Sequence, residues 1–123
     1  MKSVKFENKA SKILSVIGNP FRIKVLLTIG TGEACVCHLE TILKKRQAFI
    51  SQHLMALRTA GILETRREGK YIFYRLADPD TYTLIQTAGK LAGLADDQIP
   101  KMEDPNTSPK CCCPQCTGEQ SNK

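Results

Sequence analysis

The stretch RQAFISQHLMALRTAGILETRREGKYIFYRL, residues 46–76, decides the fold of this chain. Side chains in its first part recur at helical spacing, at Phe49, Ile50, His53, Leu54 and Leu57. Gly61 then offers a stop for that helix. Aromatic and β-branched residues dominate the second part, on both sides of a tight turn at residues 68–70. The stretch therefore predicts a helix followed by a hairpin of two strands, 62–67 and 71–76.

Helical spacing continues on both sides of this stretch. Apolar residues at intervals of three and four predict helices over residues 6–17, 20–29, 35–43 and 81–95. Asn19 and Pro20 are a typical helix start, because Asn caps the first turn and Pro fits the first helical position. The segment Lys44 to Arg46 separates the 35–43 helix from the next one, which makes the pair a helix-turn-helix candidate. The sequence thus predicts a mainly α fold with a β-hairpin wing, that is, a winged helix-turn-helix.

Positive charge is concentrated in the same region. The whole chain has 18 Lys and Arg against 12 Asp and Glu, a net charge of +6. The window from Lys44 to Arg75 holds eight basic residues and two acidic ones, a net charge of +6. The basic and acidic residues in the rest of the chain are therefore equal in number. Concentrated positive charge attracts polyanions such as nucleic acid, whereas the plainer interpretation is a solvated basic face. The polar side of the predicted helix, with Gln47, Ser51 and Gln52, suits hydrogen bonding to base edges.

The length of 123 residues fits one domain, and the composition changes near its end. Prolines among polar residues replace the hydrophobic periodicity after Asp97. We therefore divide the chain into a folded domain, residues 1–97, and a flexible Cys-rich tail, residues 98–123. No apolar run reaches the roughly 18 residues of a membrane span, and no apolar stretch follows the basic start as in a secretory signal. We expect a cytoplasmic protein with no membrane partner.

Six cysteines are unevenly distributed along the chain. Cys35 and Cys37 lie at the N-terminal end of the 35–43 helix, and the other four crowd into the tail: Cys111, Cys112, Cys113 and Cys116. In a reducing compartment such clusters indicate soft-metal binding or redox chemistry rather than structural crosslinks. The helix N-terminus favours the thiolate, which binds soft ions, although two small buried residues are the simpler interpretation of the pair. Cys113 and Cys116 have the spacing of a thiol oxidoreductase motif, but no βαβ pattern surrounds them, so we expect no enzyme.

Several motifs together resemble the ArsR/SmtB family of arsenic- and metal-responsive repressors. They are Asn19-Pro20-Phe21-Arg22, residues 32–37 with Cys35-Val36-Cys37, Ser51-Gln52-His53-Leu54, residues 57–58 and 60–62, and residues 67–70 and 74–76 of the hairpin. The resemblance covers residues 6–95 of the chain. It implies a transcriptional repressor that binds operator DNA with an inverted repeat, as a homodimer built on the helices 6–17 and 81–95. It also implies that the helix with Gln47 enters the major groove and that the wing lies near the adjacent minor groove.

The resemblance further implies which residues contact DNA. Base contacts are expected from Gln47, Ser51 and Gln52. Phosphate contacts are expected from basic residues of the helix and the wing: Arg46, Arg58, Arg66, Arg67 and Lys70. His53 is a further DNA-binding candidate, but its place one turn before Leu57 favours a packed, hydrogen-bonded histidine.

The pair of Cys35 and Cys37 matches the thiolate motif of the family. Glu40 occupies the position of a frequent third cysteine, so a third thiolate must come from elsewhere, and the tail cysteines are the candidates. His38 is expected to face solvent rather than to ligate zinc. The sequence therefore predicts a repressor that arsenite, As(III), releases from its operator. A soft divalent ion such as cadmium (Cd), lead (Pb) or zinc (Zn) is the alternative inducer, and a disulfide or persulfide at Cys35 or Cys37 is another switch. No organic cofactor is expected.

Overall fold

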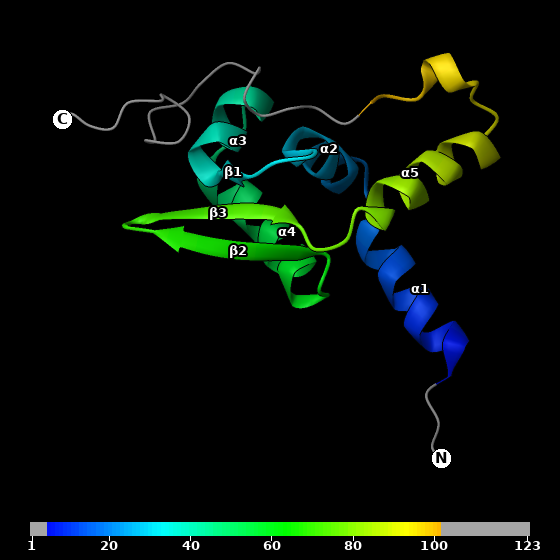
Figure 1. The fold of residues 1–123 in the computed structure, drawn as a ribbon, viewed down its shortest axis with the longest axis horizontal. Helices are drawn as coiled ribbons and strands as arrows, with labels where there is room; N and C mark the ends of the chain where they lie inside the picture. Colours follow the sequence, from blue (N-terminus) through cyan, green and yellow to red (C-terminus); the bar gives the residue numbers. More distant parts are fainter. Residues whose placement is uncertain (1–4, 102–123) are drawn as a thin grey trace.

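The computed structural model describes residues 5–101 of the chain. Five helices and three short strands make up this part (Figure 1). The helices are α1 (Phe6–Ile17), α2 (Pro20–Ile29), α3 (Val36–Leu43), α4 (Gln47–Thr59) and α5 (Asp80–Leu91), and the strands are β1 (Ala34–Cys35), β2 (Leu63–Glu68) and β3 (Tyr71–Leu76). The predicted fold class, a mainly α winged helix-turn-helix, is confirmed. The tail cysteines Cys111, Cys112, Cys113 and Cys116 lie outside the described residues.

The predicted start of α2 and the predicted end of α4 are both confirmed. The Asn19 side-chain oxygen accepts hydrogen bonds from the backbone N–H groups of Phe21 and Arg22, at 2.9 and 3.1 Å, and caps α2. Gly61 follows α4 with a φ of 82°, a left-handed conformation that favours glycine. Its N–H donates to the Arg58 carbonyl and closes the last turn. Both boundaries follow from the local sequence.

Helix α5 ends at Leu91, so the predicted end at Ala95 was wrong. Gly93 has a φ of 96°, and two backbone hydrogen bonds of the Schellman type close the helix around it. The prediction continued past this glycine because apolar residues follow it. The 3₁₀ turn Asp96–Gln98 comes next, and it leads to Ile99, which is buried.

The sheet contains one strand that the sequence did not predict. The hairpin strands β2 and β3 pair antiparallel, and the two-residue strand β1 pairs with the other edge of β3, in the order β1-β3-β2. A strand of two residues is too short to show an alternating pattern, which is why the sequence gives no sign of it. Cys35 lies opposite Phe73 of β3, and Phe73 lies opposite Arg66 of β2. The sheet therefore joins the strand that carries Cys35 directly to strand β3 of the wing.

A hydrophobic core joins α2, α3, α4 and the base of the hairpin. Its buried members include Val25, Leu26, Ile29, Leu39, Ile50, Leu54, Leu57 and Leu63. The other two helices contribute little to it, because α1 buries Ile17 alone and α5 buries no residue. Large apolar side chains stay exposed on these helices, with Phe6 at 80% and Leu91 at 85% of full exposure. Both helices lie on the side of the molecule away from the hairpin tip (Figure 1).

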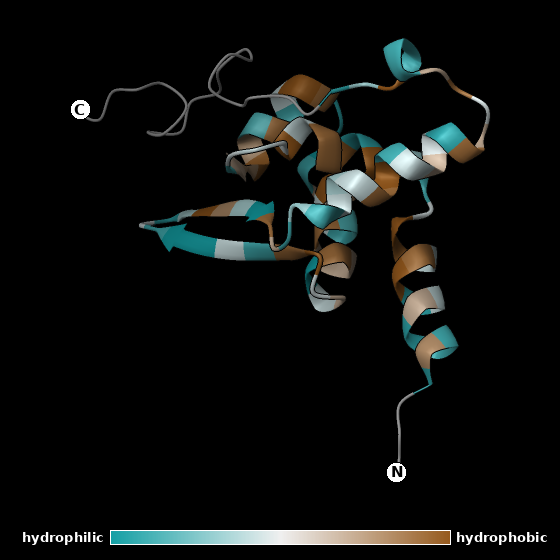
Figure 2. Ribbon diagram, turned by 45° about the vertical axis from the view of Figure 1, so that its right-hand side comes forward, coloured by the Kyte–Doolittle hydropathy of each residue, from teal (hydrophilic) through white to brown (hydrophobic). Residues whose placement is uncertain are grey.

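The hairpin projects from the helices and is hydrophilic toward its tip (Figure 2). Gly69, with a φ of 63°, allows the two-residue turn between Glu68 and Tyr71. The wing is thus an exposed basic element, and its base is anchored in the core that also holds α4.

No helix within residues 5–101 has the length and the apolar character needed to cross a membrane.

Candidate functional site

Helix α4 has one buried side and one exposed side. Ile50, Leu54 and Leu57 are fully buried in the core. Gln47 and Gln52, two of the residues expected to contact bases, are exposed, and Ser51 is partly exposed. The apolar side therefore holds α4 in place while its polar side chains stay accessible, as a helix that enters a DNA groove requires.

Met55 belongs to the exposed side of α4, and the sequence analysis did not single it out. Its side chain is 60% exposed although methionine is apolar. An apolar side chain on a groove-facing helix suits contact with the methyl group of thymine. The sequence could have shown that Met55 lies on the exposed side. It comes one turn after Ser51 and outside the apolar stripe of Ile50, Leu54 and Leu57.

The connection between α3 and α4 is short and sharply bent. It consists of Lys44, Lys45 and Arg46, as predicted. Lys44 adopts a left-handed φ of 57°, which is uncommon for a residue other than glycine. Its N–H donates to the Glu40 carbonyl at 2.8 Å and closes the end of α3. Because only three residues connect the two helices, we expect a displacement of α3 to displace α4 as well.

Four of the side chains expected to contact phosphates are exposed cations: Arg46, Arg58, Arg67 and Lys70. In the part of the chain that the structure describes, none of the four takes part in an ion pair. Lys70 lies over the Tyr71 ring, 5.6 Å from its centroid. These side chains can meet DNA phosphates without first giving up a carboxylate partner.

Arg66 differs from these four cations. It forms a bidentate ion pair with Glu33, with a shortest contact of 2.8 Å, and a second ion pair with Glu68 at 3.0 Å. Its guanidinium also lies over the Phe73 ring, 4.8 Å from the centroid. The hydrogen bonds to Glu33, which have the largest effect, and to Glu68 raise the pKa of Arg66 above its usual value. Arg66 therefore ties the wing to the loop that precedes β1.

His53 lies at the contact between α2 and α4. Its Nδ1 atom accepts a hydrogen bond from Nε of Arg22 at 3.0 Å, and its ring packs against the rings of Phe21 and Phe49. Burial, and then the charge of Arg22, lower the pKa of His53 from 6.5. The packed, hydrogen-bonded histidine that the sequence favours is confirmed. A contact of His53 with DNA stays a prediction.

Cys35 and Cys37 meet at the start of α3. Cys35 ends β1 and is the N-terminal cap of α3, and Cys37 belongs to the first turn of that helix. Sγ of Cys35 accepts a hydrogen bond from the backbone N–H of His38 at 3.4 Å. The two sulfur atoms lie 2.8 Å apart, beyond the roughly 2.05 Å of a disulfide, so both residues are thiols. The predicted location of the pair at the N-terminal end of α3 is confirmed.

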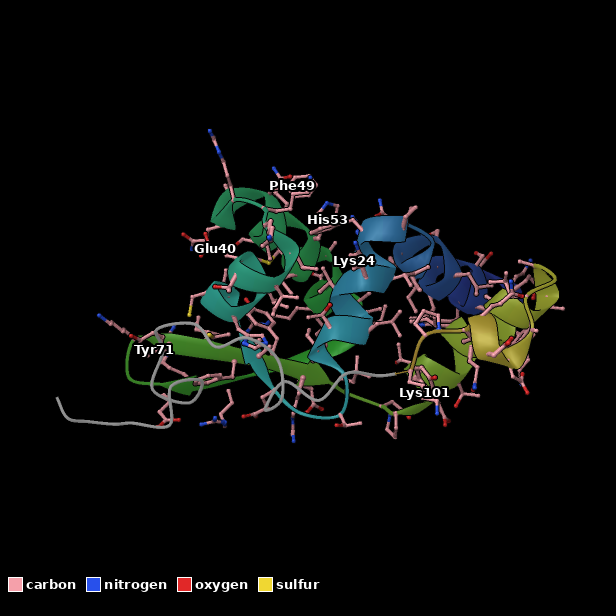
Figure 3. The ribbon with its side chains drawn as sticks, turned by 90° about the horizontal axis from the view of Figure 1, so that it is seen from above. Lys24, Glu40, Phe49, His53, Tyr71 and Lys101 are labelled. Carbon is pink, nitrogen blue, oxygen red and sulfur yellow. The ribbon has the colours of Figure 1, made fainter. Side chains whose placement is uncertain are left out.

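A pocket of about 270 Å³ opens beside the two thiols. Its lining combines the start of α3, the first residue of α4 and the tip of the wing: Cys35, Val36, Cys37, Glu40, Gln47, Lys70, Tyr71 and Ile72. Glu40 on α3 and Tyr71 on β3 lie at the same end of the molecule (Figure 3). A group bound at the thiols is therefore next to both elements that are expected to contact DNA.

His38 is fully buried, so the expectation that it faces solvent was wrong. The physical reason is that α3 packs against α2, α4, β1 and β3, and His38 and Leu39 are the buried residues of this helix. Within residues 5–101, no three or more His, Cys, Asp and Glu side chains gather into a set of metal ligands. In this part of the chain, the two thiols are therefore not joined by a third ligand such as Glu40.

Comparison with known proteins identifies the family of this chain. Residues 19–65 match the family described as bacterial regulatory protein, arsR family. The biofilm growth-associated repressor of Agrobacterium fabrum is 42% identical over 83 residues, which cover 65% of this chain and 71% of that protein. The chain belongs to the ArsR/SmtB family. This ArsR/SmtB protein is also similar to the arsenical resistance operon repressor of Escherichia coli, with 37% identity over 67 residues, or 54% of this chain and 57% of that protein.

A solved structure supports the same assignment. The homodimeric winged helix-turn-helix DNA-binding domain Mb0332 from Mycobacterium bovis, a possible ArsR-family transcriptional regulator, has a TM-score of 0.63 and 25% identity. The match covers 75% of this chain and 90% of that one. The ArsR/SmtB protein is therefore a DNA-binding transcriptional repressor and not an enzyme.

Proposed function

We propose that this repressor binds an inverted-repeat operator as a homodimer and leaves it when As(III) binds Cys35, Cys37 and a third thiolate. The observation that carries the proposal is the pair of thiols 2.8 Å apart, in a pocket shared with α4 and the wing. Thiolates are the ligands that soft ions prefer. The third thiolate comes from the tail, residues 98–123, which follows the folded domain, residues 1–97, and holds four cysteines: Cys111, Cys112, Cys113 and Cys116.

Two observations support the homodimer. Helices α1 and α5 expose large apolar side chains, among them Phe6, Leu14 and Leu91. Apolar surface of this kind is typical of contacts between subunits. The similar Mb0332 domain is itself homodimeric. A two-fold dimer presents α4 twice, so it suits an operator whose two half-sites are related by the same symmetry.

Ion binding requires the two sulfur atoms to move apart. For zinc, one of the alternative inducers, bonds of about 2.3 Å in tetrahedral geometry separate two thiolate sulfurs by about 3.8 Å, and the sulfurs around the proposed As(III) must likewise leave room for the ion between them. In the structure they are 2.8 Å apart. Cys35 is held by β1, which pairs with the wing strand β3, while Cys37 moves with α3. Because three residues connect α3 to α4, spreading the thiols displaces α4 relative to the wing, and the geometry that fits DNA is lost.

The free energy that this mechanism requires is modest. A loss of operator affinity of about 5- to 150-fold needs an ion that binds the released state more tightly by about 1–3 kcal/mol. An ion that binds both states equally shifts nothing. The spread arrangement of the thiols provides the required difference, because the ion forms its full set of sulfur bonds in the released state.

Two observations favour As(III) as the inducer: Cys35 and Cys37 offer it thiol ligands, and one relative of the chain carries the name of an arsenic response. The E. coli relative is named an arsenical resistance operon repressor. Cadmium, lead and zinc also accept thiolate ligands and are the alternative inducers for the same site. The 2.8 Å approach of the two sulfur atoms favours a further alternative, the oxidation of Cys35 and Cys37 to a disulfide.

The experimental probe is a labelled DNA duplex that the protein selects from a random-sequence pool. Its fluorescence anisotropy is followed while the reduced protein is titrated with arsenite, cadmium, lead, zinc or hydrogen peroxide, together with the thiolate absorbance. We expect arsenite to release the wild-type protein, and Cys37→Ser to bind the duplex and stay bound. Thr41→Ser is the matched control on the exposed side of α3, and it should respond like the wild type.

Each other outcome has a defined meaning. If arsenite, cadmium or lead still releases Cys37→Ser, the thiol pair is not the sensor and the proposal fails. If cadmium, lead or zinc releases the wild-type protein and arsenite does not, the site stands and As(III) is replaced as its inducer. If peroxide alone releases it, the pair is an oxidative switch instead.

A further inference from the structure

A hydrogen-bonded bridge links the first turn of α2 to two other helices. Arg22 donates from Nη1 to the Val16 carbonyl of α1 and from Nε to Nδ1 of His53 in α4, both at 3.0 Å. The Asn19 side-chain oxygen accepts the Arg22 N–H at 3.1 Å and so fixes the backbone at this position. A single side chain therefore connects α1, α2 and α4.

Two aromatic rings pack against the His53 end of this bridge. The centroids of the Phe21, Phe49 and His53 rings are 4.9, 5.1 and 4.8 Å apart, in tilted and edge-to-face arrangements. Figure 3 shows Phe49 and His53 together on the edge of α4 near α2, the helix that carries Lys24. Packing of this kind prefers defined ring orientations. The Nδ1 atom of His53 thus stays directed at Arg22.

The bridge supplies an angular constraint that the core does not. Apolar contacts are non-directional, and α4 is already held in the core by Ile50, Leu54 and Leu57. A guanidinium is planar and donates its hydrogen bonds along fixed directions. Two such bonds from the Arg22 side chain therefore define how α1 and α4 lie relative to each other, beyond keeping them in contact.

We propose that Arg22 is a positioning residue for DNA recognition, which fixes the angle between α1 and the groove-entering helix α4 through Val16 and His53. In a two-fold dimer that contacts its partner through α1, this angle sets the distance between the two α4 helices. Half-sites on DNA are bound at a matching separation. Arg22 thereby determines which half-site spacing the repressor accepts. The inference rests on the homodimer of the proposed function and is independent of the inducer.

Protonation of His53 breaks this bridge. Nδ1 is an acceptor only while the imidazole is neutral, and protonation places two cations against each other at 3.0 Å. Burial and the charge of Arg22 lower the pKa of His53 below 6.5, so the bridge is complete at neutral pH and is lost in acid. The charged group that contacts His53 is Arg22 from α2, and Lys45 lies over the ring of its neighbour Phe49, 5.8 Å from the centroid. Helix α1 contributes the neutral Val16 carbonyl.

The experiment measures preference for half-site spacing as well as affinity. The half-site comes from the duplex that the wild-type protein selects, and further duplexes carry one base pair more or fewer between the half-sites. At pH about 8, we expect Arg22→Gln to lose about 10-fold in affinity for the selected spacing and to discriminate less among the three duplexes. Lys24→Gln removes a cation from the same helix and is the matched control, which should discriminate like the wild type.

A second arm of the experiment leaves Arg22 in place and varies the pH. Wild-type discrimination among the three duplexes should decline when the pH is lowered from about 8 through the lowered pKa of His53, to the most acidic pH at which the dimer persists. His53→Asn, which keeps an acceptor near Nδ1 and does not titrate, should discriminate equally over this whole range. Sedimentation of each protein verifies the dimer, so a failure of the homodimer is recognised separately. The proposal is overturned if Arg22→Gln discriminates like the wild type, or if acid affects His53→Asn as strongly as the wild type.

Discussion

Removing Arg67 should flatten the salt dependence of operator binding, whereas removing Arg66 should leave it nearly unchanged. Both residues are exposed cations of β2 and are adjacent in sequence. Arg66 is paired with Glu33 and Glu68, while Arg67 has no ion-pair partner in the part of the chain that the structure describes. A phosphate contact by Arg67 displaces counterions from DNA. The same contact by Arg66 has to replace carboxylates that already neutralise its charge.

The size of the effect follows from the number of expected phosphate contacts whose cations have no ion pair. Of the residues expected to contact phosphates, each protomer has four exposed cations that take part in no ion pair within residues 5–101: Arg46, Arg58, Arg67 and Lys70. For a homodimer, the slope of log affinity against log salt is then about −7, a loss of about four orders of magnitude between about 50 and 200 mM salt. Arg67→Ala, present in both protomers, should reduce the slope by about 2. Arg66→Ala is the matched control.

Anisotropy titrations of the selected duplex at several salt concentrations measure both slopes, with a scrambled duplex as a test of sequence preference. Arg67→Ala should weaken binding to both duplexes by a similar factor, because phosphate contacts carry no sequence information. If Arg66→Ala flattens the slope as much as Arg67→Ala does, the reasoning about its carboxylate partners is refuted. If Arg67→Ala changes the preferred sequence, that residue contacts a base.

Two further predictions concern the tail and the dimer. Serine at all four tail cysteines, Cys111, Cys112, Cys113 and Cys116, should weaken release by arsenite without changing operator affinity in the anisotropy assay; an unchanged response would exclude the tail as the source of the third thiolate. Leu91→Glu should convert the dimer to a monomer at micromolar concentration in sedimentation velocity, because Leu91 is 85% exposed in the protomer and a carboxylate is costly to bury without a partner. A dimer that survives this change would show that the α5 end lies outside the interface.

Local rules predict most of the elements in this fold. Capping residues such as Asn19 and Gly61, and the three- and four-residue spacing of apolar side chains, act within one or two helical turns. The helices α1 to α4 and the hairpin therefore lie within about two residues of their predicted bounds. The end of α5 was predicted wrongly because Gly93, with its left-handed φ, stops the helix although apolar residues continue beyond it.

Contacts between distant residues explain what the sequence did not reveal about the site. The thiol pair is where its spacing and position suggest, but β1, which joins Cys35 to the wing, depends on pairing with β3. The ion pair of Arg66 and Glu33 connects residues far apart in the chain, so no local pattern shows it. His38 is buried on a helix that packs against α2, α4, β1 and β3, and that packing exists only in the folded chain.

If the thiol pair is the sensor, as proposed, the unequal exposure of its two members imposes an order on the capture and the loss of an ion. Cys37 is partly exposed, whereas Cys35 has 1% of its surface exposed. An incoming ion therefore meets the Cys37 sulfur first and reaches Cys35 only after α3 has shifted. In the proposed mechanism, an adduct with one sulfur therefore precedes the chelate. Loss of the ion would begin from the chelate, so a second sulfur bond has to break before the protein can return to its operator.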